Sequence, residues 1–165
     1  GRNEGAQIGP LITEKAVEKV EDHVKDAVDK GANILTGGVG DNAGTQFYKP
    51  TVITGITNEM KIYYEETFGP VAPLIKFKDE AEVIKMANDT KYGLAGYFYS
   101  RDIGKIWRVA EALEYGMIGI NAGVISTEVA PFGGIKESGI GREGAEEGIE
   151  EYLEIKYLCF DGVEK

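Results

Sequence analysis

The sequence predicts an α/β protein in which flanking helices cover an open parallel sheet. Between residues 71 and 121, three short apolar segments alternate with two segments whose apolar residues recur at helical spacing. Asp79 and Asp102 stand directly before the two helical segments, where their side chains can cap the first turn. Strands and helices that alternate in this order form parallel sheets joined by right-handed crossovers.

The first element is an amphipathic helix that Thr13 caps and Gly31 ends. Its apolar residues fall at three- and four-residue spacing on one face: Val17, Val20, Val24, Ala27 and Val28. His23 flanks this stripe, and we expect it to be a partly solvated surface residue. Short strands follow at 33–36 and 51–54, on either side of a glycine-rich loop.

The β-α-β-α-β segment comes next, with strands at 71–77, 94–99 and 117–121 and helices at 79–88 and 102–115. The second helix turns Ile106, Val109, Ala110 and Leu113 inward. Ligands of open parallel sheets bind beyond the carboxyl ends of the strands. Asn121 and the loop after it therefore lie where a site is expected.

The end of the chain predicts a short helix over 141–148 and a closing strand over 152–160. Leu153, Ile155, Tyr157 and Cys159 alternate with polar residues and share one face of that strand. No hairpin partner precedes the strand, so we expect it to pair with another copy of the chain. Cys159 is then a buried or interface thiol.

Composition excludes several classes of function. The chain has 18 basic and 28 acidic residues, a net charge of −10, which disfavours general nucleic-acid binding. One histidine and one cysteine cannot build a Cys/His zinc site, and a lone cysteine excludes a disulfide framework. There is neither an apolar run of membrane-spanning length nor an apolar signal segment at the start. We therefore expect a cytoplasmic protein with no membrane association.

A literal G-x-G-x-x-G occurs at Gly139, Gly141 and Gly144. The dinucleotide-binding fingerprint requires an apolar strand before it and a complete strand after the following helix. Residues 133–138 are not an apolar strand, and the chain ends at residue 165. A tight loop that enters a helix explains the pattern better than a dinucleotide site.

Two other loops hold candidate binding residues. In the loop at 65–70, Glu66 and Phe68 can present a carboxylate and a ring to one ligand, or the loop is merely charged with one buried phenylalanine. In the loop after Asn121, Ser126 and Thr127 either bond a polar substrate group or simply form turns. The residues alone indicate a pocket without a catalytic nucleophile.

These segments together resemble the C-terminal third of the aldehyde dehydrogenase superfamily. The resemblance runs from residue 8 to Cys159 and is carried by three motifs: Glu65-Glu66-Thr67-Phe68-Gly69-Pro70, Asn88-Asp89-Thr90-Lys91-Tyr92-Gly93-Leu94-Ala95 and the glycine-rich segment 131–144. Within the superfamily the chain looks most like the succinate-semialdehyde dehydrogenases, through residues 111–116, 125–132 and 151–157.

The resemblance implies oxidation of an aldehyde to an acid with NAD or NADP. In this family a cysteine thiolate forms a thiohemiacetal, hydride leaves to the nicotinamide, and a glutamate activates water to hydrolyse the thioester. It further implies that Glu66 accepts hydrogen bonds from the nicotinamide ribose and that Phe68 packs near the nicotinamide. Ser126 is implied to help bind the substrate carboxylate, and Phe132 to line the substrate tunnel.

The resemblance also implies that working parts lie outside this chain. The family's nucleophilic cysteine, general-base glutamate and carboxylate-binding arginines all precede the matching region, so we assign no catalytic residue here. We expect residues 1–150 to be part of the catalytic domain and residues 151–165 to form an oligomerisation strand and tail. The alternatives are a dehydrogenase for lactaldehyde, glyceraldehyde or another semialdehyde, and a non-catalytic binding module.

Overall fold

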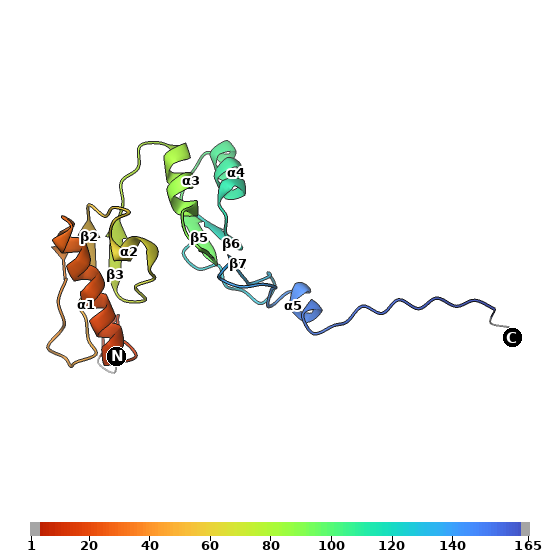
Figure 1. Ribbon diagram of the computed structural model, residues 1–165, viewed down its shortest axis with the longest axis horizontal. Coiled ribbons are helices and arrows are strands. Elements are labelled where there is room, and N and C mark those ends of the chain that lie inside the picture. The colour runs from red at the N-terminus through yellow and green to blue at the C-terminus, as the bar shows by residue number, and fades with distance from the viewer. Residues whose placement is uncertain (1–3, 163–165) are drawn as a thin grey trace. The chain divides into compact units, whose positions relative to one another are not determined.

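The computed structural model describes residues 4–162, which form two compact units divided between Phe77 and Lys78 (Figure 1). Each unit has its own helices and sheets. The first contains one long helix, one short helix and three strands: α1 (Glu14–Asp29), β1 (Asn33–Thr36), β2 (Thr51–Thr54), α2 (Lys61–Tyr64) and β3 (Val71–Leu74).

Helix α1 forms where the sequence predicts it. The Thr13 side chain accepts a hydrogen bond from the Ala16 amide at 3.2 Å, which satisfies one of the free donors of the first turn. The apolar stripe of the helix packs against the strands and the segments around them. The buried residues of this core are Val17, Val20, Val24, Ala27, Ala32, Tyr48, Ile53, Ile56, Met60 and Ile62.

The sheet of the first unit has the order β1-β2-β3. Strand β2 is central, antiparallel to β1 and parallel to β3, with Thr51 opposite Val71 and Thr54 opposite Leu74. Its position explains why Thr51 and Ile53 are buried. Strand β3 lies at the edge, a position that suits Pro73 because proline has no N–H to donate to a second neighbour.

The second unit contains three helices and four short strands: α3 (Glu80–Asn88), β4 (Tyr92–Gly93), β5 (Ala95–Phe98), α4 (Ile103–Ala112), β6 (Met117–Ile120), β7 (Ile135–Lys136) and α5 (Glu147–Glu150). Strands β5 and β6 are parallel, with Ala95 opposite Met117, and α4 connects them. Strands β4 and β7 form a separate antiparallel pair. Asp79 and Asp102 cap α3 and α4 as predicted, by accepting from the amides three residues on.

The α/β class is confirmed, but the single open sheet is not. The predicted run of three parallel strands is divided, because β3 pairs with β2 in the first unit while β5 pairs with β6 in the second. The short helix α2 and the pair β4–β7 were not predicted. Both are too short for a periodic pattern to reveal them.

The C-terminal region also differs from the prediction. The helix expected at 141–148 is reduced to α5, because Gly141, Gly144 and Ala145 have φ values of 80°, 69° and 48°, which a right-handed helix cannot include. Residues 153–160 are extended (Figure 1) and pair with no strand among the described residues. Their side chains are exposed, including that of Cys159. The expected pairing of this segment with another copy of the chain stays a prediction.

The second unit has a thin apolar core. Within its described residues, Val109 is the one apolar side chain that is buried, and Ile106, Ala110 and Leu113 are only partly buried. Large side chains such as Ile103 and Trp107 are 68% and 64% exposed. None of the helices between residues 4 and 162 is long and apolar enough to span a membrane.

Candidate functional site

The loop at 65–70 connects α2 to β3 and is fixed at both ends by backbone hydrogen bonds. The Glu65 amide donates to the Lys61 carbonyl at 2.9 Å and so closes α2. At the other end, the Pro70 carbonyl accepts from the Thr51 amide at 2.8 Å, which joins the loop to the central strand. The loop is thus part of the framework of the first unit.

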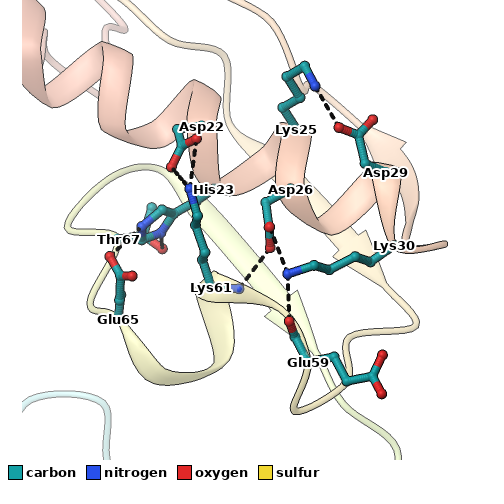
Figure 2. A network of polar contacts seen from close by, with 10 residues as sticks. All are labelled: Asp22, His23, Lys25, Asp26, Asp29, Lys30, Glu59, Lys61, Glu65 and Thr67. Carbon is teal, nitrogen blue, oxygen red and sulfur yellow. Dashed lines mark hydrogen bonds and ion pairs between the residues drawn. The ribbon is translucent and has the colours of Figure 1, made fainter.

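Helix α1 holds the middle of this loop from one side. The Lys19 ammonium donates to the Glu66 carbonyl. The His23 ring lies 3.1 Å from the Thr67 hydroxyl through Nδ1 and 3.3 Å from the Glu65 carboxylate through Nε2, as Figure 2 shows. Val20 lies between Lys19 and His23 on the helix and packs against Gly69. A Cβ added to Gly69 would lie only 2.5 Å from Cγ2 of Val20.

A second set of contacts fixes α1 on α2 beside the loop (Figure 2). Asp26 accepts from the Lys61 amide at 2.8 Å and pairs with Lys30 at 2.8 Å, while the Lys61 ammonium binds Asp22 at 2.7 Å. The hydrogen bond from the Lys30 ammonium, followed by the one from the Lys61 amide, lowers the pKa of Asp26. The hydrogen bond that the Lys61 ammonium donates to Asp22 raises the pKa of Lys61. These contacts join α1 to the first residue of α2 and so orient the two helices that flank the loop.

The tethered loop presents two side chains to solvent. Phe68 has a φ of 48°, a left-handed conformation that is unusual for a bulky residue, and its ring is 81% exposed. Glu66 is also exposed, and Lys19 binds its backbone carbonyl, not its carboxylate. A strained backbone that keeps an aromatic ring in solvent is a pattern found at ligand sites. The alternative of a buried Phe68 is wrong.

In the second unit, two of the motifs singled out in the sequence lie together. The β4–β7 ladder pairs Tyr92 with Lys136, and the Gly93 amide donates to the Ser138 hydroxyl at 2.9 Å. Lys136, at φ 56°, donates to the carbonyls of Asn88 and Thr90 at 3.0 and 3.1 Å. The segment 88–95 therefore packs against the glycine-rich segment 131–144 and is joined to it by hydrogen bonds.

Further polar contacts complete this scaffold. Asn88 donates to the Ala112 carbonyl at 2.8 Å and accepts from the Glu114 amide at 2.9 Å, which ties the end of α3 to the end of α4. The Tyr115 hydroxyl donates to the Ala87 carbonyl at 2.6 Å, and burial raises the pKa of Tyr115. Lys136 also pairs with Glu114 at 2.6 Å.

The glycine-rich segment surrounds an open cavity of about 770 Å³. Phe132 and Glu143 exchange two backbone hydrogen bonds of 2.7 Å, and Arg142 donates to the Gly134 and Gly141 carbonyls at 2.8 and 2.6 Å. The side chain of Phe132 is half-buried in the cavity wall, where Leu94, Ile149 and Tyr152 also lie. Within this segment, the motif at Gly139, Gly141 and Gly144 follows a two-residue strand and precedes a four-residue helix, which is not the context of a dinucleotide fingerprint.

The loop after β6 begins at Asn121, which has a φ of 56° and exchanges two hydrogen bonds with the Ser100 backbone, at 2.8 and 2.9 Å. Ser126 is exposed further along this loop. Of the four binding residues predicted from the sequence, Glu66 and Phe68 belong to the first unit, and Ser126 and Phe132 to the second.

No metal centre is found in the part of the chain that the structure describes, since no three His, Cys, Asp or Glu side chains converge there. The expectation of a surface His23 is wrong, because its side chain is 1% exposed. Its spacing contained the missing signal. His23 lies three residues after Val20 and four before Ala27, within the buried stripe of α1.

Comparison with known proteins shows similarity over nearly the whole chain. The family model described as "Aldehyde dehydrogenase family" matches residues 1–158. The chain is 59% identical over 159 residues to the NADP(+) succinate-semialdehyde dehydrogenase GabD of Escherichia coli, covering 96% of this chain and 33% of that protein. It is 58% identical to a glutarate-semialdehyde dehydrogenase of Pseudomonas aeruginosa, covering 99% of this chain and 34% of the relative.

The fold agrees with a solved structure of the same kind. The crystal structure of succinate-semialdehyde dehydrogenase from Burkholderia pseudomallei matches with a TM-score of 0.95 at 59% identity, over 97% of this chain and 33% of that one. The chain spans about a third of the length of the relatives it matches. On the family match over residues 1–158, the chain belongs to the aldehyde dehydrogenase family.

Proposed function

We propose that this chain supplies the C-terminal part of an NAD(P)-dependent aldehyde dehydrogenase that oxidises succinate semialdehyde to succinate. The observation that carries the proposal is the 59% identity to the E. coli succinate-semialdehyde dehydrogenase across 96% of the chain. Two further observations support it: the loop at 65–70 exposes side chains suited to binding the coenzyme, and the second unit contains side chains suited to binding the substrate.

The loop at 65–70 fits a nicotinamide nucleotide. The exposed Glu66 carboxylate is an acceptor for the ribose hydroxyls, and the exposed Phe68 ring offers a flat apolar face for the nicotinamide. When bound, the nicotinamide supplies the hydride acceptor for aldehyde oxidation. Because α1 tethers the loop, its side chains need little reordering when the coenzyme binds.

The second unit contains the residues that we assign to substrate binding. The Ser126 hydroxyl is exposed and available to bond the carboxylate of a semialdehyde. Phe132 contributes an apolar wall to the cavity that the glycine-rich segment surrounds, and we assign it to the substrate tunnel. Succinate and glutarate semialdehydes both carry a terminal carboxylate, so the P. aeruginosa relative is consistent with the same substrate chemistry.

We place the nucleophilic cysteine, the general-base glutamate and the carboxylate-binding arginines outside this chain. Cys159 lies in the exposed segment after α5, and the matched relatives are about three times as long as the chain. The thin core of the second unit and the exposed Ile103 and Trp107 agree with a surface that the rest of a catalytic domain covers. We further propose that the enzyme is cytoplasmic.

This proposal predicts that the 165-residue chain alone does not oxidise succinate semialdehyde. Because the proposal places the nucleophilic thiolate outside this chain, no reduced coenzyme should form with NAD⁺ or NADP⁺ in a spectrophotometric assay. A fusion protein in which the part of E. coli GabD that precedes the matched region is joined to this chain should form it readily. Turnover by the chain alone, or a folded fusion protein without turnover, would contradict the proposal.

The tail at 151–165 is proposed to join subunits, because Ile155 and Tyr157 are 101% and 85% exposed and no strand among the described residues pairs with them. In the fusion protein, Ile155→Lys should convert an oligomer into monomers in sedimentation-velocity experiments. Lys156→Gln is the matched control, since residue 156 faces the opposite way in an extended strand. An unchanged oligomer in the Ile155→Lys variant would exclude this role.

A further inference from the structure

His23 is a buried polar side chain in the apolar face of α1. Both of its ring nitrogens form hydrogen bonds with residues of the loop at 65–70. Its side chain is 1% exposed, and it lies within the stripe that contains Val20 and Val24. Burying an imidazole without partners costs free energy, so both ring nitrogens need hydrogen bonds. Thr67 and Glu65 supply them, at 3.1 and 3.3 Å.

The two hydrogen-bond partners fit one tautomer of the neutral imidazole ring. The Glu65 carboxylate only accepts, so Nε2 carries a proton and donates to it. Thr67 offers a hydroxyl, which donates to an unprotonated Nδ1 when the ring is neutral. The imidazole thus bridges two loop residues that are separated in sequence by Glu66 alone.

We propose that His23 is a positioning residue for the coenzyme, acting through Thr67 and Glu65 on the side chains of Glu66 and Phe68. This inference rests on the proposed function of the loop. The ring anchors the residues on both sides of Glu66, and Thr67 is the residue directly before Phe68. With the Lys19 ammonium on the Glu66 carbonyl, three consecutive loop residues are bound to one face of α1.

The backbone conformation explains why such an anchor is needed. A φ of 48° at Phe68 is unfavourable for a bulky residue and persists only where neighbouring contacts impose it. The apolar ring is also 81% exposed, so burial of its own surface does not hold it in place. The restraint comes from behind the loop, through the His23–Thr67 hydrogen bond and the close contact between Val20 and Gly69.

The first test uses NMR spectroscopy of the 165-residue chain, in which His23 is the one histidine and its signals are unambiguous. Long-range ¹H–¹⁵N correlation spectra should show a protonated Nε2, and Thr67→Val should shift the Nδ1 resonance. Backbone order parameters at Phe68 should be near about 0.85 in the original chain and fall below about 0.6 in Thr67→Val. Thr67→Ser, which retains the hydroxyl, should restore the rigid value.

A matched control is Thr45→Val, which removes a hydroxyl bonded to Glu14 elsewhere in the same unit. It should leave the order parameter of Phe68 unchanged. An unprotonated Nε2, or a Thr67→Val loop as rigid as the original, would overturn the proposal. These spectra require no coenzyme, so they decide the anchoring whether or not the proposed enzymatic function holds.

The second test uses the fusion protein and separates positioning from general stability. Thr67→Val should raise KM for the coenzyme about fivefold to tenfold, the effect of losing one buried hydrogen bond, and leave KM for succinate semialdehyde within about twofold. Thr67→Ser should recover most of the affinity. An equal rise in both constants, or none in either, would assign His23 to stability alone. A fusion protein without turnover would instead count against the proposed function.

Discussion

Replacing Gly116 with alanine should unfold most of the second unit. A Cβ at this position would stand 2.0 Å from the Gly133 carbonyl oxygen and 2.9 Å from Gly134 Cα, both backbone atoms of the family segment 131–144. The backbone at Gly116 cannot move away from Gly133 to relieve this clash, because the Gly116 amide donates to the Gly93 carbonyl at 2.9 Å. We expect a loss of about 3 kcal/mol, at the upper end for overpacking.

The thin apolar core of the second unit gives it little stability to offset this loss. In ¹H–¹⁵N spectra, the resonances of residues 78–162 should collapse toward random-coil positions, while those of the first unit remain. Gly123→Ala is the matched control, since the nearest atom to its Cβ is the Tyr99 hydroxyl oxygen at 4.0 Å. Urea denaturation that gives Gly116→Ala and the original chain the same free energy of unfolding would show that the described contact is wrong.

Replacing Glu66 with glutamine should strongly impair the fusion protein. Glutamine retains the size of the side chain but loses the charge that strengthens a hydrogen bond from a ribose hydroxyl. A charge-assisted hydrogen bond contributes about 1.5–3 kcal/mol, so kcat/KM for the coenzyme should fall roughly tenfold to a hundredfold. Steady-state kinetics with varied coenzyme at saturating aldehyde measure the effect.

Glu59→Gln provides the control for this loss of charge. The Glu59 carbonyl accepts from Lys30 at 2.6 Å, while its carboxylate points away from the network around α1 (Figure 2). This variant should retain kcat/KM. If the Glu66→Gln and Glu59→Gln variants have equal kinetics, Glu66 does not contact the coenzyme.

Local patterns predicted much of the fold. The spacing of apolar residues in α1 and the caps Thr13, Asp79 and Asp102 depend on neighbours within one helix, and all three caps form as expected. The division of the expected sheet was not visible, because the partner of β3 is β2, a strand about twenty residues earlier. Strand pairing at that distance has no signal in a local pattern.

In the candidate site too, local features were predictable from the sequence and long-range contacts were not. The motif containing Glu66 and Phe68 was recognisable from its residues, but its anchor on α1 was not. The expectation of a surface His23 placed this residue beside the apolar stripe of α1, whereas the structure buries it within the stripe. The decisive fact is that its two hydrogen-bond partners lie 42 and 44 residues away.

The most direct measurement is a crystal structure of the fusion protein with NADP⁺ bound. The account predicts the Glu66 carboxylate within about 3 Å of a hydroxyl of the nicotinamide ribose, with the Phe68 ring against the nicotinamide. It also predicts that the His23 ring still bridges Thr67 and Glu65. A bound coenzyme whose nicotinamide half lies away from both Glu66 and Phe68 would contradict it.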